Sequence, residues 1–397
     1  MKFFFITPKF NLRNISGSIV EYDIMIRDLM KLGHQVTVVT AFSDLNDGLE
    51  GAPYKVIEEN INRPRRLLKI QKRVFWILRK YSDQADFFYV DGQVFLYGAG
   101  LYRRLGGRVP VSAYFNRELV CWPDGEANFL SQDDNFLVRI KKNLRFYIEK
   151  YIGMPIASNI DLMLFTNPHL KKSYENFGLR MKTGRVLIFG DSVDVRKNMK
   201  EHGVTEDYYV KRNKISEKLN IFYSSRMVPG KGFELLINAF SKIKNKEKFN
   251  LILGGTGPRE SMIKKMVKEL GLDPYVAFPG WVAREEIFNS YKKADIFVQP
   301  RWRRDLTSMS LIDAMTFGVP IVAPGGGGLE WDAKNSALYF KDGNADELAH
   351  RIEELGNNRE LRAKLSKACY KRLAENEMRH DWQAERWSNK MREIKNQ

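Results

Sequence analysis

The segment from Asn220 to Ile243 decides how the chain is expected to fold. It reads NIFYS at 220–224, SRMVPGKG at 225–232 and FELLINAFSKI at 233–243. The first part is typical of a short buried strand, the second is a turn with proline and glycine, and the third has the spacing of an amphipathic helix. A strand, a turn and a helix in this order make the first half of a βαβ unit, which builds parallel sheets.

The same alternation extends in both directions and predicts two doubly wound α/β domains, Rossmann-like and facing each other across a cleft. A length of 397 residues suits two domains. We expect an N-terminal domain over 1–195 and a C-terminal domain over 196–377, with a final helix at 378–397 packing back on the first through Trp382 and Trp387. Further strands are expected at 2–6, 35–40, 87–90, 109–115, 162–165, 185–189, 250–253, 276–278, 296–299 and 320–323. Further helices are expected at 19–32, 259–270, 284–294, 308–317 and 345–355.

Composition limits the cellular setting. The chain has only two cysteines, Cys121 and Cys369, far apart in sequence, which suits a reducing compartment. The opening apolar run is too short for a signal-peptide core, and no run approaches the length of a transmembrane helix. We therefore expect a cytoplasmic protein. The net charge of +17 implies an anionic partner: a nucleic acid, an anionic bilayer or phosphorylated small molecules.

Two cations stand in the turn of the opening segment. Arg226 leaves the end of the expected strand, and Lys231 lies just before a helix whose free N–H groups attract anions. Together they suit a diphosphate. The alternative is a solvated turn with two ordinary surface cations.

A second loop, PRWRRDLTSMSLID at 300–313, also joins an expected strand to a helix that Thr307 or Ser308 could cap. Asp313 lies in the apolar face of that helix, where a carboxylate is costly unless it is bonded, and sugar or ribose hydroxyls are suitable donors. Alternatively, Asp305 is only a partner of the helix dipole and Asp313 a surface residue. A third strand-to-helix loop, GGTGP at 254–258, has glycines that let the backbone approach a ligand.

In this order the three segments resemble the C-terminal domain of the family 4 retaining glycosyltransferases of the GT-B fold. That family shows Ser-Arg…Lys-Gly, then Gly-x-Gly-Pro, then a paired Glu-x7-Glu-Ala-Met run ending in Gly-x-Pro-Val. The counterparts here are SR…KG at 225–232, GTGP at 255–258 and D…DAM…GVPIV from 305 to 322, with FPGWV at 278–282 matching the family's usual strand end.

The resemblance implies a metal-independent hexosyltransferase that uses a nucleotide-diphosphate sugar, UDP or GDP, and no cofactor. Arg226 and Lys231 would neutralise the departing diphosphate in place of a metal ion, and the chain contains no Asp-x-Asp triplet. Asp305 would contact the transferred sugar. The remaining donor-binding residues implied are Gly17, Gly255, Trp281, Thr307, Ser308, Met309 and Asp313.

Three departures from the family pattern stand out. Both paired glutamates are aspartates here, so the donor must sit closer or differ. The glycine pair inside the motif is replaced by Leu306 and Ser308. Where the family often has a histidine on the acceptor side, this chain has Asn116, which can hydrogen-bond a substrate but cannot carry a proton.

The positive charge is concentrated between Ile61 and Lys80, which hold eight cations and no acid. As a helix, this stretch places the cations and one tryptophan on one face and apolar residues opposite. That pattern favours attachment to the anionic inner face of the cell membrane, and hence a glycan or lipid-linked acceptor. The alternative is an ordinary solvated basic face. The predicted membrane face consists of Arg65, Arg66, Lys69, Lys72, Arg73, Trp76 and Lys80.

Three rival functions remain. A basic nucleic-acid-binding protein lacks support from any zinc spacing or RNA-binding run. A nicotinamide dehydrogenase is disfavoured because the first strand-to-helix turn lacks Gly-x-Gly-x-x-Gly. A sugar phosphorylase or epimerase of the same fold is the nearest alternative. The oligomeric state is not predicted.

Overall fold

The computed structural model describes residues 1–13, 17–59, 66–119, 121, 135–212, 218–300 and 306–397. The chain forms two compact units. Unit 1 comprises Met1–Ser192 together with Arg379–Gln397, and unit 2 comprises Val193–Met378. The expected boundary was after residue 195.

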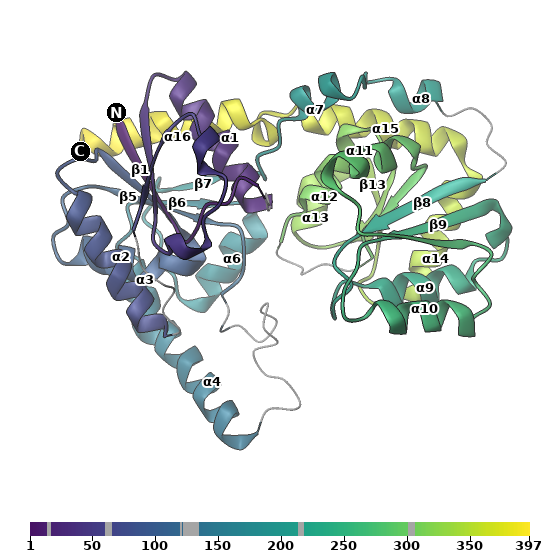
Figure 1. Cartoon of the computed structure of the whole chain (residues 1–397), viewed down its shortest axis with the longest axis horizontal. Helices are drawn as coiled ribbons and strands as arrows, with labels where there is room; N and C mark the ends of the chain where they lie inside the picture. The colour runs from purple at the N-terminus through teal and green to yellow at the C-terminus, as the bar shows by residue number, and fades with distance from the viewer. Residues whose placement is uncertain (14–16, 60–65, 120, 122–134, 213–217, 301–305) are drawn as a thin grey trace. The chain divides into compact units, whose positions relative to one another are not determined.

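Unit 1 is built on a parallel sheet of seven strands in the order β3-β2-β1-β4-β5-β6-β7 (Figure 1). The strands are β1 Lys2–Thr7, β2 Gln35–Thr40, β3 Lys55–Glu58, β4 Phe87–Asp91, β5 Val111–Phe115, β6 Leu162–Phe165 and β7 Val186–Ile188. The helices are α1 Gly17–Lys31, α2 Leu67–Tyr81, α3 Gly92–Arg104, α4 Phe136–Ile148, α5 Met154–Ala157, α6 Pro168–Phe177 and the C-terminal α16 His380–Lys395. A π-helical segment, Glu149–Gly153, joins α4 to α5.

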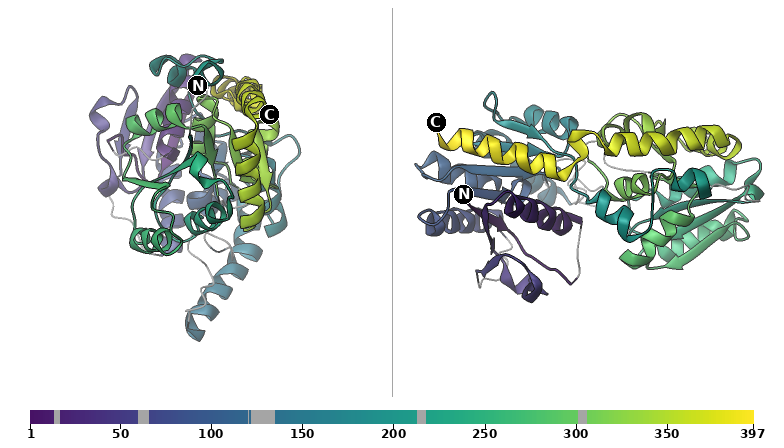
Figure 2. Two further views of the ribbon diagram at one scale, coloured as in Figure 1. Left: turned by 90° about the vertical axis from the view of Figure 1, so that its right-hand side faces the viewer. Right: turned by 90° about the horizontal axis from the view of Figure 1, so that it is seen from above.

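The C-terminal helix α16 packs against unit 1. Its Trp387 is fully buried, with its ring 5.5 Å from that of Phe3 and 5.8 Å from that of Phe5 between centroids. Ser388 Oγ lies 2.7 Å from His34 Nε2. Figures 1 and 2 both show α16, in yellow, running beside α1. The last residues of the chain therefore complete the core around its first strand.

Unit 2 repeats the architecture with six parallel strands in the order β10-β9-β8-β11-β12-β13. The strands are β8 Leu219–Ser224, β9 Phe249–Gly254, β10 Val276–Gly280, β11 Ile296–Val298, β12 Ile321–Pro324 and β13 Ala337–Phe340. The helices are α7 Val195–Glu201, α8 Tyr208–Arg212, α9 Phe233–Lys242, α10 Glu260–Glu269, α11 Arg284–Lys293, α12 Met309–Thr316, α13 Gly328–Ala333, α14 Ala345–Asn357 and α15 Arg359–Leu373.

Helices cover both faces of the unit 2 sheet, which explains why its strands are apolar at successive positions. Side chains alternate between the two faces along a strand. Thus Ile221 and Tyr223 of β8 pack in one core cluster with Leu236 of α9, whereas Phe222 packs in a second cluster with Leu311 of α12. The predicted class, two doubly wound parallel α/β units, is confirmed.

Two of the elements that sequence reasoning did not predict, β3 and α3, have weak local signals. Strand β3 has only four residues, none of them fully buried, and lies at the edge of its sheet. Helix α3 contains three glycines, a composition that disfavours helix. Close packing explains one of them, because a Cβ on Gly98 would lie 2.4 Å from the carbonyl oxygen of Gln71 in α2. Among the described helices, none is long and apolar enough to cross a membrane.

Candidate functional site

Two of the three loops that the sequence singled out flank the point where the strand order of unit 2 reverses. From β8 the chain proceeds outward to β9 and β10, and it then returns to β11 on the other side of β8 before continuing to β12 and β13. The loop after β8 contains Arg226 and Lys231, and the loop after β11 leads into α12. In open parallel sheets, this reversal point at the carboxyl ends of the strands is where ligands bind.

Backbone hydrogen bonds join the loops after β8, β9 and β10. The N–H of Met227 donates to the carbonyl of Thr256 at 2.8 Å, and the N–H of Gly255 donates to the carbonyl of Gly280 at 2.7 Å. Gly255 has φ +111°, and a Cβ there would lie 1.9 Å from the carbonyl oxygen of Ser225. The glycine is therefore required for the β9 loop to lie directly against the Ser225–Arg226 turn.

The side chain of Arg226 is exposed and that of Lys231 is half-buried. The Tyr223 hydroxyl donates to the carbonyl oxygen of Lys231 at 2.6 Å, which ties the end of the loop to β8. Burial raises the pKa of Tyr223 above its ordinary value, so the hydroxyl stays a neutral donor. Gly232, with φ +77°, precedes the first residue of α9, so Lys231 lies next to the free N–H groups of a ten-residue helix. Sequence reasoning did not single out Tyr223, because it lies within an apolar strand.

Trp281 directly follows β10 and is 69% exposed. Its backbone neighbour Gly280 accepts the hydrogen bond from Gly255. The loops carrying Arg226, Gly255 and Trp281 are thus linked in series along one edge of the sheet.

At the other loop, Thr307, Ser308 and Asp313 are each at most 6% exposed. The N–H of Ser308 donates to Asp332 Oδ2 at 3.2 Å, and α12 begins at the next residue, Met309. The burial of Asp313 rules out the surface alternative for this residue. Asp305 lies outside the described residues, so its predicted contact with the sugar stays a prediction.

Unit 1 brings a second set of polar side chains to the carboxyl edge of its sheet. Asn116 directly follows β5, and its Nδ2 donates to Glu21 Oε2 at 3.3 Å. The Tyr114 hydroxyl donates to Glu21 Oε1, also at 3.3 Å. Burial raises the pKa of Glu21 well above its ordinary value, and the neighbouring Asp191 raises it further. Glu21 therefore tends to hold a proton and can act as a hydrogen-bond donor.

A further buried carboxylate, Asp91, stands at the end of β4. The Tyr22 hydroxyl donates to its Oδ2 at 3.2 Å, and burial raises its pKa to about 6. Gly17, the predicted diphosphate contact of this unit, is the first residue of α1. Sequence reasoning missed Glu21 and Asp91. The available signal for Glu21 was a carboxylate on the otherwise apolar face of the predicted helix.

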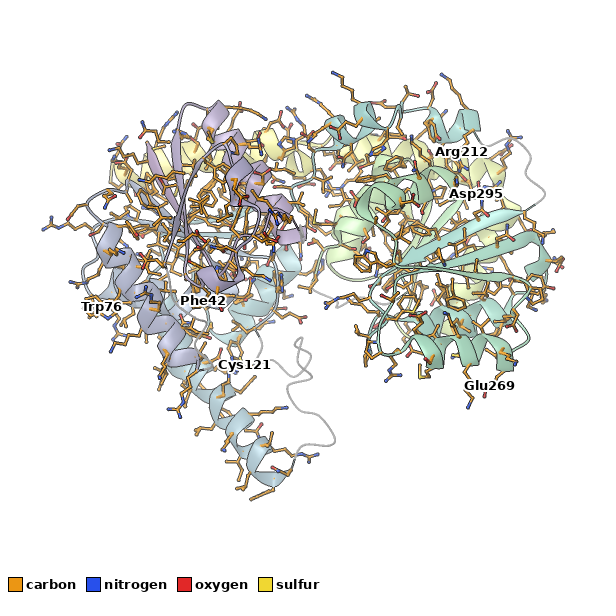
Figure 3. All side chains as sticks on the ribbon, in the orientation of Figure 1. Phe42, Trp76, Cys121, Arg212, Glu269 and Asp295 are labelled. Carbon is orange, nitrogen blue, oxygen red and sulfur yellow. The ribbon has the colours of Figure 1, made fainter. Side chains whose placement is uncertain are left out.

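The basic helix α2 has the predicted two faces. Its buried side includes Ile70, Val74 and Leu78, whereas Trp76 is 54% exposed. Figure 3 shows Trp76 on the outer side of this helix. Arg73 and Lys80, however, both bind Glu59, at 2.7 and 2.6 Å. Three other cations on this face, Arg66, Lys69 and Lys72, are exposed. Arg65 lies outside the described residues.

Within the parts of the chain that the structure describes, no three histidine, cysteine, aspartate or glutamate side chains are grouped so that they could hold a metal ion. Both cysteines are free and buried.

Residues 205–372 match the sequence model of the family described as glycosyl transferases group 1. This range covers the β8 loop, the β9 loop and α12. This part of the chain is therefore similar to that family of glycosyltransferases, and the two doubly wound parallel units have the GT-B fold.

Two curated relatives align with parts of the chain. A mannosylfructose-phosphate synthase of Agrobacterium fabrum is 28% identical over 214 residues, 51% of this chain and 44% of that protein. A GDP-mannose-dependent phosphatidylinositol monomannoside mannosyltransferase of Mycobacterium tuberculosis is 29% identical over 154 residues, 36% of this chain and 40% of that protein. The chain therefore aligns with less than half the length of either relative.

Among solved structures, that of Anabaena HepE in complex with UDP superimposes with a TM-score of 0.68 at 16% identity. The alignment covers 99% of this chain and 100% of that one. At this level of identity the likeness establishes the fold.

Proposed function

We propose that this protein is a retaining, metal-independent glycosyltransferase that moves a hexose from a nucleotide-diphosphate donor to a glycan or lipid-linked acceptor. One observation carries the proposal: the family match coincides with a pair of loops that flank the strand-order reversal of unit 2, and one of those loops presents Arg226 and Lys231 beside a helix N-terminus.

Arg226 and Lys231 bind the donor diphosphate in this proposal. During glycosyl transfer, negative charge develops on the departing diphosphate while positive charge develops on the sugar. Two preorganised cations and the N–H groups at the start of α9 stabilise the leaving group without a metal ion. Gly255 allows the Arg226 turn to be held by the β9 loop, and Tyr223 holds Lys231 through its carbonyl.

The second loop binds the rest of the donor. Asp313, buried in α12, accepts hydrogen bonds from the ribose hydroxyls. Backbone N–H groups around Thr307, Ser308 and Met309 contact the phosphates or the sugar, and Asp305 contacts the transferred sugar. Trp281, exposed beside the β9 loop, offers an aromatic surface to the donor.

The nucleotide of the donor is UDP or GDP. The name of the mycobacterial relative specifies GDP-mannose, and the Anabaena structure contains UDP. The mycobacterial relative shares part of the sequence of this chain, and the Anabaena protein shares its fold. Both nucleotides therefore belong in the first test.

Unit 1 binds the acceptor, with Asn116 on that side, and Gly17 stays a predicted contact of the donor. Asn116 is held by Glu21, so its remaining carbonyl oxygen can accept a hydrogen bond from an acceptor hydroxyl. The exposed cations of α2, with Trp76, attach this unit to the anionic inner surface of the cell membrane. A lipid-linked acceptor would be presented at that surface.

The first test measures the melting temperature with UDP, GDP and ADP. We expect one of the three to raise it, since a ligand that binds the folded state stabilises that state. Arg226→Ala should abolish most of that shift and lower turnover by about 100-fold or more. The control is Arg359→Ala, which removes an exposed arginine from the start of α15. If none of the nucleotides stabilises the protein, the proposed function is wrong.

Two further measurements test the finer parts of the proposal. Retention predicts that the product has the same anomeric configuration as the donor, which NMR of the isolated product reports. Metal independence predicts that turnover persists in a chelating buffer.

A further inference from the structure

Helix α4 exposes a continuous apolar stripe. It begins at the N-cap Asn135, whose side chain accepts from the N–H of Val138 at 2.9 Å, and none of its 13 residues is buried. Phe136 is 76% exposed, Leu137 66% and Leu144 57%. The α4 stripe consists of Phe136, Leu137, Ile140, Leu144, Tyr147 and Ile148, all exposed large hydrophobic residues.

The stripe is confined to one side of the helix. At 100° per residue its six members span about 120° of the helix circumference. The opposite side carries Phe146, whose ring lies 5.1 Å from that of Phe177 in α6. Figure 1 shows α4 extending away from the sheet of unit 1, and Figure 3 shows side chains on every side of this helix. The helix is thus anchored at its C-terminal end, whereas its apolar side faces solvent.

The comparison with α2 shows that such exposure is unusual in this protein. Both helices are basic and amphipathic, but the apolar face of α2 is packed on unit 1, including Ile70, Val74 and Leu78. The apolar side of α4 has no such cover among the described residues. A large exposed apolar surface is characteristic of an interaction site.

The charges of α4 identify the kind of partner. The helix contains Arg139, Lys141, Lys142 and Arg145 and no acidic residue. Lys141 borders one edge of the stripe and Arg139 the other. Two copies paired through their stripes would bring these like charges together, whereas an anionic bilayer offers hydrocarbon to the stripe and phosphate groups to the cations.

We propose that the α4 stripe is the element that inserts into an anionic lipid bilayer. Thirteen residues make a helix of about 20 Å, too short to span the hydrocarbon core, so α4 lies in the plane of the interface. The cations of α2 provide long-range attraction, and the α4 stripe provides the salt-resistant part of the binding. This inference rests on the proposed membrane location and names the surface responsible for it.

The test is co-sedimentation of the full chain with phosphatidylcholine vesicles, with and without phosphatidylglycerol, at low and high salt. We expect binding to the anionic vesicles, part of which persists at high salt. The variant Leu137→Asp/Leu144→Asp should bind the anionic vesicles at least about tenfold more weakly than the parent, because charges replace two inserted side chains. Both residues are exposed, so the fold is not at risk.

The matched control is Leu105→Asp/Leu270→Asp. It makes the same change in net charge at two other exposed leucines, 55% and 42% exposed, outside α4. This control should bind like the parent protein. Equal binding by the α4 variant and the parent, or equal loss in both variants, would overturn the assignment.

A second copy as the partner is the other outcome to distinguish. If the parent forms a dimer by light scattering, the α4 variant is monomeric and neither binds vesicles, the stripe is a dimer interface and the proposal is wrong. Failure of the proposed enzymatic function would be seen separately, in the absence of a nucleotide-dependent melting shift, which is measured without vesicles.

Discussion

Replacing Gly255 by alanine perturbs the proposed donor site at a single backbone contact. The added Cβ would lie 1.9 Å from the carbonyl oxygen of Ser225, and the residue has φ +111°. The backbone conformation alone costs about 1–3 kcal/mol for a residue with a side chain. Because the neighbour is a backbone atom, the clash cannot be relieved by a change of rotamer, and the Ser225–Arg226 turn must move.

The size of the movement sets the expected effect on function. Side-chain carbons rarely approach other atoms closer than 3.0 Å, so the two loops must separate by about 1 Å. A misplacement of about 1 Å in a catalytic group can lower the rate by about 100-fold. We expect a similar loss of nucleotide affinity, since the Arg226 guanidinium moves with its turn.

The assay compares melting temperatures with and without the nucleotide that stabilises the parent. At a concentration of about 100 times the parent Kd, that ligand stabilises the folded state by about 2.7 kcal/mol. A variant that binds about 100-fold more weakly would gain only about 0.4 kcal/mol under the same conditions. The nucleotide-dependent shift should therefore almost disappear.

Gly271→Ala is the control for the backbone conformation. Gly271 follows α10 with φ +64°, and a Cβ there meets no atom within 4 Å. This variant should lose stability but keep the full nucleotide shift. If Gly255→Ala also keeps the full shift, the contact between the β9 loop and the Ser225–Arg226 turn does not position an anion site.

Two other predictions concern unit 1. Trp387→Ala should lower its stability by about 3–5 kcal/mol and the Tm by roughly 6–20 °C, because a fully buried indole is removed from the core beside β1. Thermal unfolding followed by circular dichroism checks this. The control is Trp382→Ala, at a tryptophan of the same helix that is only half-buried, and equal losses of Tm in the two variants would contradict the prediction. Glu21→Gln should stabilise the protein increasingly as the pH rises above 4.5, the ordinary pKa of the carboxyl. The raised pKa means that the unfolded chain releases this proton at lower pH than the folded chain, so the parent loses stability as pH rises, and the uncharged amide does not. A stability difference that does not vary with pH between 4.5 and 8, measured as Tm, would argue against a buried protonated Glu21.

The loops after β8 and β11 show how much of the structure could be predicted from the sequence. Short apolar runs followed by glycine-containing turns and amphipathic helices are local patterns, and they predicted the order of strands and helices around Arg226 and Asp313. The position of a loop at the end of a strand follows from the same pattern, since parallel strands direct their carboxyl ends to one edge. For Asp313 the sequence allowed two interpretations, a bonded carboxylate in the apolar face or a surface residue, and only its burial in the structure excluded the second.

Other features depend on residues that are distant in sequence. Burial raises the pKa of Glu21, and Asp191, 170 positions away in sequence, raises it further. Trp387 is buried only because the last helix returns to β1. The strand order that places the β8 and β11 loops next to each other is likewise a property of the whole sheet.

The amino-acid sequence by itself determined the βα alternation, the class of fold and the presence of two cations in the loop after β8, because periodicity and turn chemistry act over a few residues. Tertiary structure alone decided which face of each amphipathic helix is covered. Helices α2 and α4 are both basic and amphipathic, yet the apolar side of α2 is packed on unit 1 and that of α4 faces solvent. Burial depends on what other parts of the chain bring to a surface, and no local pattern contains that information.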